Sequence, residues 1–309
     1  MKQFRFGVSV WGATSAAEWR TKAQDAEARG FDVLLTADHL IDGIFSPLSG
    51  LLAAADATER LRLGTLVLNN DFRHPALVAR EAAMIDLLSG GRLEVGLGAG
   101  HMKHEYDSAG LAFDPAAVRV ARMTEAADVL RRLWSEESVT FEGDHYRLRD
   151  ARCYPRPVQQ PLPLLIGGNG RKVLSAAARL ADIVGFTGFS QVEGQRNVNP
   201  THFTDGGLAQ QLEWVRAAAG DRFETLELST LVQGVTVTND RQAVAIELQP
   251  LLPSLSVDDV LSSPYSLIGT EREIADQLLE RRAHLGISYL TVFEKDIDAM
   301  TRVIALLRE

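Results

Sequence analysis

Cysteine and basic charge are both scarce in this chain. Cys153 is the single cysteine among 309 residues, so no disulfide can form within the chain. Such a composition is typical of the cytoplasm, where disulfides are rare. The 32 Lys and Arg residues are outnumbered by 41 Asp and Glu residues, which gives a net charge of −9. Nucleic-acid-binding proteins usually carry a basic surface, so we expect no nucleic acid as a partner.

Long apolar runs are also missing. No stretch approaches the roughly 18 consecutive apolar residues that a membrane-spanning helix needs. The N-terminus, MKQFRFGVSV, enters a strand-like run without the apolar region and cleavage site of a signal peptide. We therefore expect no membrane association. Hydrophobic residues make up 46% of the chain, which is enough for a sizeable core in a globular protein.

Strand-like and helix-like segments alternate from end to end. Short apolar runs predict eight strands, near residues 4–10, 33–36, 61–68, 93–97, 164–166, 183–186, 226–237 and 289–293. Helical spacing lies between them, for example over 16–29, 75–88 and 171–180. Such alternation implies right-handed crossovers and a parallel sheet, and eight parallel strands close a barrel. We predict an α/β fold, a (β/α)8 TIM barrel, with residues 1–309 as one domain. An open doubly wound sheet is the alternative.

Two segments depart from this alternation. Residues 139–148 place a Glu-Gly-Asp-His turn between two strand-like runs, which predicts a small β-hairpin. Residues 190–207 are rich in Gln, Asn, Gly and Thr and show no periodic pattern. Long loops in compact domains are uncommon and often functional. We interpret 190–207 as a lid over the site, with a disordered surface loop as the alternative.

Polar or glycine-rich motifs follow three of the predicted strands, where barrel active sites are built. Asp38-His39 follows the second strand and could exchange protons near neutral pH, although Asp38 could equally cap a turn. Residues 96–101 (GLGAGH) follow the fourth strand, and their glycines permit close approach of a ligand or form a tight turn. Residues 167–171 (GGNGR) follow the fifth strand and open a helix. Free amides and the helix dipole there predict an anion site, with a plain αL turn as the alternative.

Metal and hydrolase motifs are not matched. His101 and His104 lie three residues apart, but the run HMKHE fits neither H-E-x-x-H nor H-x-x-E-H, and no further ligand cluster accompanies it. We expect no metal site. The G-x-S-x-G motif of serine hydrolases is absent from the sequence.

An ordered series of segments resembles the luciferase-like flavin and deazaflavin oxidoreductases. The segments are ARGFDVLLTADHL, LRLGTLVLNN, DLLSGGRLEVGLGAGHMKHEYDSAGLAFD, PLPLLIGGNGRKVLSAAARLADIVGF and GTEREIADQLLERRAHLGISYLTVF. The resemblance is strongest to single-barrel members that use coenzyme F420. It implies an F420-dependent oxidoreductase that transfers a hydride between the deazaflavin and a small organic substrate, in a homodimer. An FMNH2-dependent monooxygenase is the alternative with FMN as cofactor. A non-catalytic flavin-binding accessory protein is an alternative of another class.

The resemblance also implies roles for individual residues. His39 would face the reactive edge of the cofactor as the catalytic group, together with Asp38. A cis peptide between Leu66 and Val67 would back the ring, and the phosphate would lie at residues 168–171. The implied cofactor contacts are Asp38, Leu66, Val67, Asn69, Ala99, Gly100, His101, His104, Gly168, Asn169, Gly170 and Arg171.

Three positions bear on the substrate. Trp11 and Phe186 end the first and sixth strands and would either wall the substrate pocket or pack the barrel rim. Related F420-dependent sugar-phosphate dehydrogenases carry an acidic glutamate after the glycine turn, where this chain has His101. This departure argues against sugar-phosphate chemistry. It makes His101 either a second polar group in the pocket or a cofactor contact.

Overall fold

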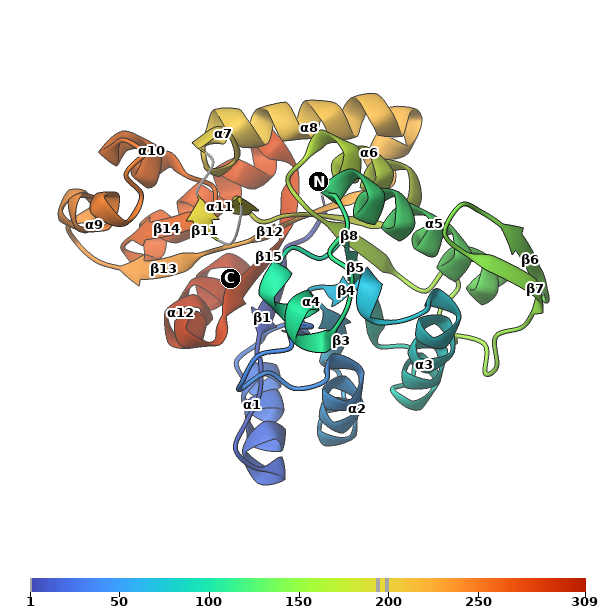
Figure 1. Ribbon diagram of the computed structural model, residues 1–309. Coiled ribbons are helices and arrows are strands. Elements are labelled where there is room, and N and C mark those ends of the chain that lie inside the picture. The colour runs from blue at the N-terminus through green and yellow to red at the C-terminus, as the bar shows by residue number, and fades with distance from the viewer. Residues whose placement is uncertain (1, 193–194, 198–199) are drawn as a thin grey trace.

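A closed barrel of parallel strands forms the centre of the molecule (Figure 1). The computed structural model describes residues 2–192, 195–197 and 200–309. Within these residues the barrel strands are β1 (Arg5–Ser9), β2 (Val33–Thr36), β3 (Arg62–Thr65), β5 (Leu93–Gly98), β8 (Leu164–Gly167), β9 (Ile183–Phe186), β12 (Glu227–Leu231) and β15 (Ile287–Phe293). β1 pairs with both β2 and β15, and β3 pairs with β5, so the ring is closed. The predicted (β/α)8 fold is confirmed, and the open sheet is excluded.

Helices surround the barrel wall. They are α1 (Ala16–Ala28), α2 (Pro47–Ala57), α3 (Pro75–Leu88), α5 (Ala116–Ser135), α6 (Arg171–Leu180), α8 (Asp205–Ala219), α11 (Glu271–Leu285) and α12 (Ile297–Arg308). Local signals fix their ends. A capping box between Thr270 and Glu273 begins α11, and Gly286 ends it with a φ of +75°. No described helix is long and apolar enough to cross a membrane.

The third strand is interrupted, whereas the sequence predicted one strand over 61–68. β3 stops at Thr65, the Leu66–Val67 bond is cis, and the short strand β4 (Leu68–Asn69) then resumes pairing with β5. This bulge presses against glycines of β5. A Cβ on Gly96 would lie 2.0 Å from the carbonyl oxygen of Thr65, and one on Gly98 would lie 2.5 Å from Cγ2 of Val67. Glycine is therefore required in β5 because the bulge leaves no room for a side chain.

Two small additions extend from opposite sides of the barrel (Figure 1). One is the hairpin of β6 (Val139–Glu142) and β7 (Arg147–Ala151), close to the predicted position. In the other, β13 (Gly234–Val237) pairs with β14 (Ser266–Gly269), with α9 (Arg241–Leu248) and α10 (Val257–Ser262) between them. The sequence pattern predicts one strand over 226–237, whereas the segment contains both β12 and β13, and it does not predict β14.

The predicted lid segment contains regular structure where it is described. β10 (Ser190–Val192) pairs with β11 (Gln195–Asn197), α7 (Pro200–Phe203) follows, and α8 begins at Asp205. Residues 193–194 and 198–199 of the predicted loop lie outside the described residues. The lid role of 190–207 stays a prediction.

The barrel interior is filled by side chains. Its apolar cluster consists of Val33, Leu35, Leu165, Ile183 and Tyr289, and Leu66 and Val67 pack against it. A larger cluster fills the space between the barrel wall and the helices. Because the lumen is a packed core, a ligand has to bind at the rim of the barrel.

The N-terminal ends of the strands carry a buried charge cluster. Glu94, near the start of β5, is 3% exposed and forms ion pairs with Arg5 of β1 and Arg62 of β3. Arg5 also pairs with Glu227 of β12 at 2.6 Å. Four strands are thus joined at one pole of the barrel, opposite the ends that carry the sequence motifs.

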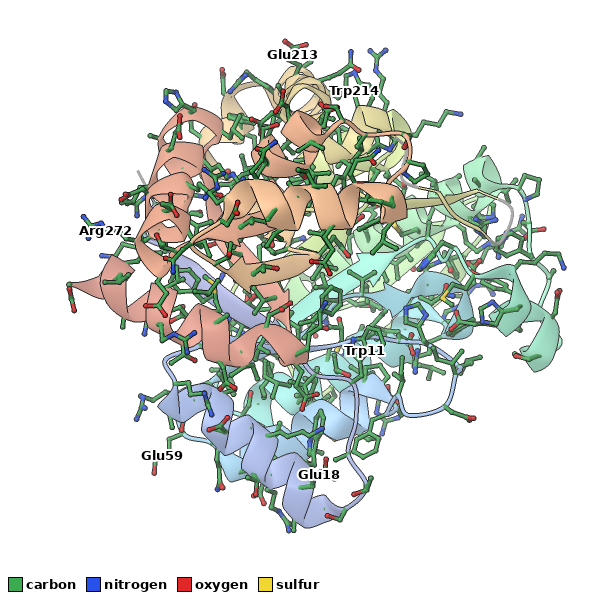
Figure 2. The ribbon with its side chains drawn as sticks, turned by 90° about the vertical axis from the view of Figure 1, so that its left-hand side faces the viewer. Trp11, Glu18, Glu59, Glu213, Trp214 and Arg272 are labelled. Carbon is green, nitrogen blue, oxygen red and sulfur yellow. The ribbon has the colours of Figure 1, made fainter. Side chains whose placement is uncertain are left out.

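We predict that Glu94→Ala lowers the free energy of unfolding by about 3 kcal/mol, because the partly buried Arg62 loses its carboxylate partner and Arg5 keeps only Glu227. Urea denaturation measures the change. Glu59→Ala is the control, since Glu59 is exposed on the surface (Figure 2) and its loss should alter stability by at most about 0.5 kcal/mol. Equal effects of the two substitutions would show that the cluster does not anchor the barrel.

Candidate functional site

The motifs singled out in the sequence meet at one rim of the barrel. His39, the Leu66–Val67 bulge, the glycine turn at 98–100 and residues 168–171 each follow the C-terminal end of a strand. These strands are neighbours in the closed ring, in the order β2, β3, β5, β8. Direct contacts confirm the arrangement, because the rings of His39 and His101 lie 5.5 Å apart between centroids. The rim therefore collects polar groups from four separate parts of the chain.

His39 is held by a buried carboxylate. Its Nδ1 lies 2.9 Å from Oε1 of Glu105, and the same oxygen accepts a hydrogen bond from the amide of Leu40 at 3.0 Å. Glu105 is 1% exposed and belongs to the short helix α4 (Lys103–Ala109). A carboxylate acceptor assigns the proton to Nδ1 and leaves Nε2 as the nitrogen that could hydrogen-bond to a ligand. The side chain of His39 remains partly exposed.

Glu105 was missed by the sequence analysis. It lies in the run HMKHE, which was considered only as a metal motif, and α4 was not predicted. The contact joins residues 66 positions apart, so no local pattern could indicate it. A glutamate in a short, otherwise polar helix gives little sign that it is buried.

Asp38 and His39 have different hydrogen-bond partners. Its Oδ2 accepts hydrogen bonds from the backbone amide of Asn69 at 2.9 Å and from Nη1 of Arg73 at 2.5 Å. Within the described part of the chain, no hydrogen bond joins Asp38 to His39. Asp38 thus ties the end of β2 to the strand that follows the bulge. This favours a positioning role for Asp38, in place of a direct role in the reaction.

The bulge provides an apolar platform at the mouth of the barrel. The predicted cis bond between Leu66 and Val67 is confirmed. Both side chains are partly buried and lie on the cluster that fills the lumen. Beside them, Asn69 accepts hydrogen bonds through Oδ1 from the hydroxyl of Tyr106 at 3.0 Å and from the amide of Asp71 at 3.1 Å. The platform is therefore firmly supported from below and from one side.

The glycine turn after β5 is fixed by its neighbours. Gly100 has a φ of +72°, and a Cβ there would lie 2.0 Å from the hydroxyl of Tyr106. The buried Arg119 of α5 donates hydrogen bonds to the carbonyls of Ala99 and Gly100, at 3.2 Å and 3.3 Å. The turn can therefore adopt this shape only with glycine at position 100. It also places His101 directly at the rim.

His101 stays neutral at physiological pH. The residue is exposed at the rim, yet the protein around it lowers its pKa to about 4. Desolvation is the largest cause, followed by the positive charges that His39, Arg119 and His104 can carry. A neutral imidazole can donate or accept a hydrogen bond, but it carries no acidic proton comparable to that of a carboxylic acid. His104 is exposed on α4.

The N-terminus of α6 is open to an anion. Its N-cap residue, Gly170, provides no side-chain hydrogen bond, and a Cβ on Gly170 would meet nothing within 4 Å. Within the described residues, the amides of the first turn therefore lack a side-chain cap, and Arg171 is exposed beside them. This combination is a common phosphate site.

The two residues before Gly170 shape this turn. The amide of Gly168 donates to the carbonyl of Gly185 at 3.0 Å, so it is already engaged. The side chain of Asn169 donates to Oγ1 of Thr187 at 2.8 Å and to the carbonyl of Phe189. These bonds favour a structural role for both, and they leave the α6 amides as the groups that face an anion.

The two candidate substrate walls differ in exposure. Trp11 is 38% exposed (Figure 2). Its ring packs edge-on against Phe293, with 6.0 Å between the ring centroids. Phe186 is fully buried in the large hydrophobic cluster. Its position favours the packing alternative, because a side chain with no exposed surface cannot line a pocket.

Comparison with known sequences gives one family. A sequence model described as luciferase-like monooxygenase matches residues 3–248. An F420-dependent glucose-6-phosphate dehydrogenase of Intrasporangium calvum is 39% identical over 171 residues, which cover 51% of this chain and 49% of that protein. A protein of the same name from Nakamurella multipartita is 36% identical over 225 residues, which cover 70% of this chain and 62% of that protein. The chain thus matches about half to three fifths of the length of these relatives.

Solved structures share the fold over the whole chain. An F420-dependent secondary alcohol dehydrogenase in complex with an F420–acetone adduct superposes with a TM-score of 0.77 at 23% identity, covering 100% of both chains. A long-chain alkane monooxygenase gives a TM-score of 0.76 at 15% identity, covering 100% of this chain and 92% of the other. At such low identities the likeness establishes the barrel fold and nothing about the ligand.

We predict that the NMR titration of His101 has its midpoint near pH 4, and not near the usual 6.5, because desolvation opposes its charge. The unfolded chain takes up this proton at the higher pH, so His101 should reduce stability progressively as the pH falls from about 6.5 towards 4. His101→Asn identifies the signal by its loss and should weaken this part of the pH dependence. A midpoint near 6.5 would contradict the prediction.

Proposed function

Because the chain belongs to the luciferase-like monooxygenase family, we propose that it is a coenzyme F420-dependent oxidoreductase acting on a small organic molecule. The observation that carries the proposal is the position of His39. Its imidazole is fixed by Glu105 on the same rim as an apolar platform and an uncapped helix N-terminus. The names of the relatives, F420-dependent dehydrogenases, support the choice of cofactor.

The residues at the rim fit this cofactor. Leu66 and Val67 form an apolar surface on which one face of a planar ring can lie. The first-turn amides of α6 and the side chain of Arg171 would hold the phosphate. Asn69 and the turn at Ala99 and Gly100 lie between these two regions in the order of the strands and would contact the rest of the cofactor.

The chain's own contribution to the reaction is positioning and proton transfer. When bound, F420 supplies a hydride donor or acceptor at C5 of its deazaflavin ring. Nε2 of His39 would take the proton from a substrate hydroxyl, or return it when the substrate is a carbonyl compound. Glu105 keeps the ring in one orientation and one tautomer throughout. Asp38, bound to Arg73, keeps the bulge in register with the end of β2.

The substrate is proposed to differ from that named for the relatives. The related proteins are named glucose-6-phosphate dehydrogenases, whereas the residue after the glycine turn in this chain is His101. With a pKa of about 4, His101 is neutral near pH 7 and can serve only as a hydrogen-bonding group. We therefore expect a substrate with a carbonyl, C=N or C=C group, and Trp11 as one wall of its site.

Further proposals concern organisation and location. We propose that residues 1–309 form one domain in which 190–207 covers the rim, since β10 and β11 follow β9 directly. The single cysteine, Cys153, is buried and unpaired, which supports a cytoplasmic location.

A homodimer is also proposed, because one outer face of α3 exposes a group of apolar side chains: Leu77, Met84, Leu87 and Leu88.

The cofactor assignment predicts that the purified protein binds F420 and leaves FMN unbound, which fluorescence titration with each compound measures. FMN binding alone, with oxygen-dependent turnover, would overturn the assignment and favour the monooxygenase alternative. Binding of F420 without turnover of any alcohol or carbonyl compound would favour the accessory-protein alternative.

The same titration, combined with a measurement of turnover, separates the effect of His39 on cofactor binding from its effect on catalysis. His39→Ala should retain F420 binding and lose about 100- to 10,000-fold in turnover, because a general acid–base group is removed. His284→Ala is the matched control, since His284 is exposed in the last turn of α11. Unchanged turnover in His39→Ala would refute the proton-transfer role.

For the homodimer, Leu88→Arg is expected to produce a monomer, because a charge replaces an apolar contact in the proposed interface. Sedimentation velocity measures the change in mass. Leu251→Arg is the control, as Leu251 is also exposed but lies far from α3 in the chain, after α9. A monomeric wild-type protein would contradict the proposal.

A further inference from the structure

A groove runs along the outside of the barrel between α5 and α6. Its volume is about 510 Å³. Ala117 and Ala121 lie on the α5 side, and Arg171, Lys172, Ser175 and Arg179 lie on the α6 side. The α5 wall is made of small or neutral side chains, so the basic residues of α6 face open space.

The groove concentrates positive charge in an acidic protein. The chain has a net charge of −9, yet Arg171, Lys172 and Arg179 are all exposed on one wall, and none of the described residues that line the groove is acidic. In the described part of the chain no ion pair involves any of the three. By contrast, Arg122 of the neighbouring helix α5 pairs with both Asp71 and Asp114. Uncompensated cations along a groove attract an anionic ligand.

The groove begins at the proposed phosphate site. Arg171 is the first residue of α6 and directly follows Gly170 of the uncapped turn. Arg171, Ser175 and Arg179 recur every four residues, so they share one face of the helix. Eight residues of helix span roughly 12 Å, and the positive wall therefore extends by about that length away from the rim.

We propose that this groove binds the oligoglutamate tail of F420. The proposal rests on the proposed function, because it takes F420 as the cofactor. Beyond its phosphate, F420 continues through a lactyl group into a chain of glutamates, each with a free carboxylate. A tail that leaves the phosphate site enters the groove at Arg171 and passes Lys172 and Arg179. FMN ends at its phosphate and cannot use the groove, so the same residues favour F420 over FMN.

The test compares the dissociation constants of two cofactor forms, measured by fluorescence titration. One is F420 with several glutamates, and the other is the form that ends at the phospholactyl group. The wild-type protein should bind the long form more tightly. The Lys172→Gln/Arg179→Gln variant should lose about 2- to 30-fold in affinity for the long form only, because two exposed ion pairs are removed. At 0.5 M salt the preference should shrink.

The controls separate this proposal from the cofactor assignment. Arg149→Gln, at an exposed position on β7, should leave both dissociation constants unchanged. Equal wild-type affinity for the two forms would overturn the groove proposal and keep the assignment of F420. Equal weakening of both forms in the double variant would also overturn it. Failure of the wild-type protein to bind either form would overturn the cofactor assignment itself.

Discussion

The close contact between the third-strand bulge and the fifth strand is the constraint on which the rest of the site depends. Gly96 and Gly98 have no side chain, so β5 can accept the displaced backbone at Thr65 and Val67. The bulge in turn seals the filled lumen and presents an apolar surface at the rim. Asp38 then fixes the chain just beyond the bulge through the amide of Asn69. A ligand at the rim would therefore contact an apolar platform whose shape is determined by the packing of the bulge against β5.

Two histidines at this rim have opposite surroundings and therefore suit different tasks. His39 has a buried carboxylate 2.9 Å from its Nδ1, which orients the ring. His101 has neighbours that can only add positive charge, and its pKa falls to about 4. The ring centroids are 5.5 Å apart, so one substrate could contact both. Environment, rather than residue type, separates the histidine proposed to transfer protons from the neutral one.

The sequence was sufficient for the barrel and for the strand ends that carry the motifs, because alternation and glycine patterns are local signals. The cis bond at Leu66–Val67 was predicted from the resemblance to the family, and not from a local pattern. Three features could not be predicted, because they depend on residues distant in the sequence. They are the contact of Glu105 with His39, the hydrogen bond from Arg73 to Asp38, and the burial of Phe186. In each case the residue type allowed two roles, and only the packing of other segments decided between them.

The charge cluster around Glu94 lies at the opposite pole of the barrel from the candidate site. The ion pairs that join the strands therefore lie at the N-terminal strand ends, and the candidate site lies at the C-terminal strand ends. Exchange of rim residues such as Trp11 or His101 leaves that anchor untouched, so new substrate preferences could accumulate in one lineage without loss of folding. The separation makes this scaffold suitable for laboratory evolution, with libraries confined to the segments that follow the strands.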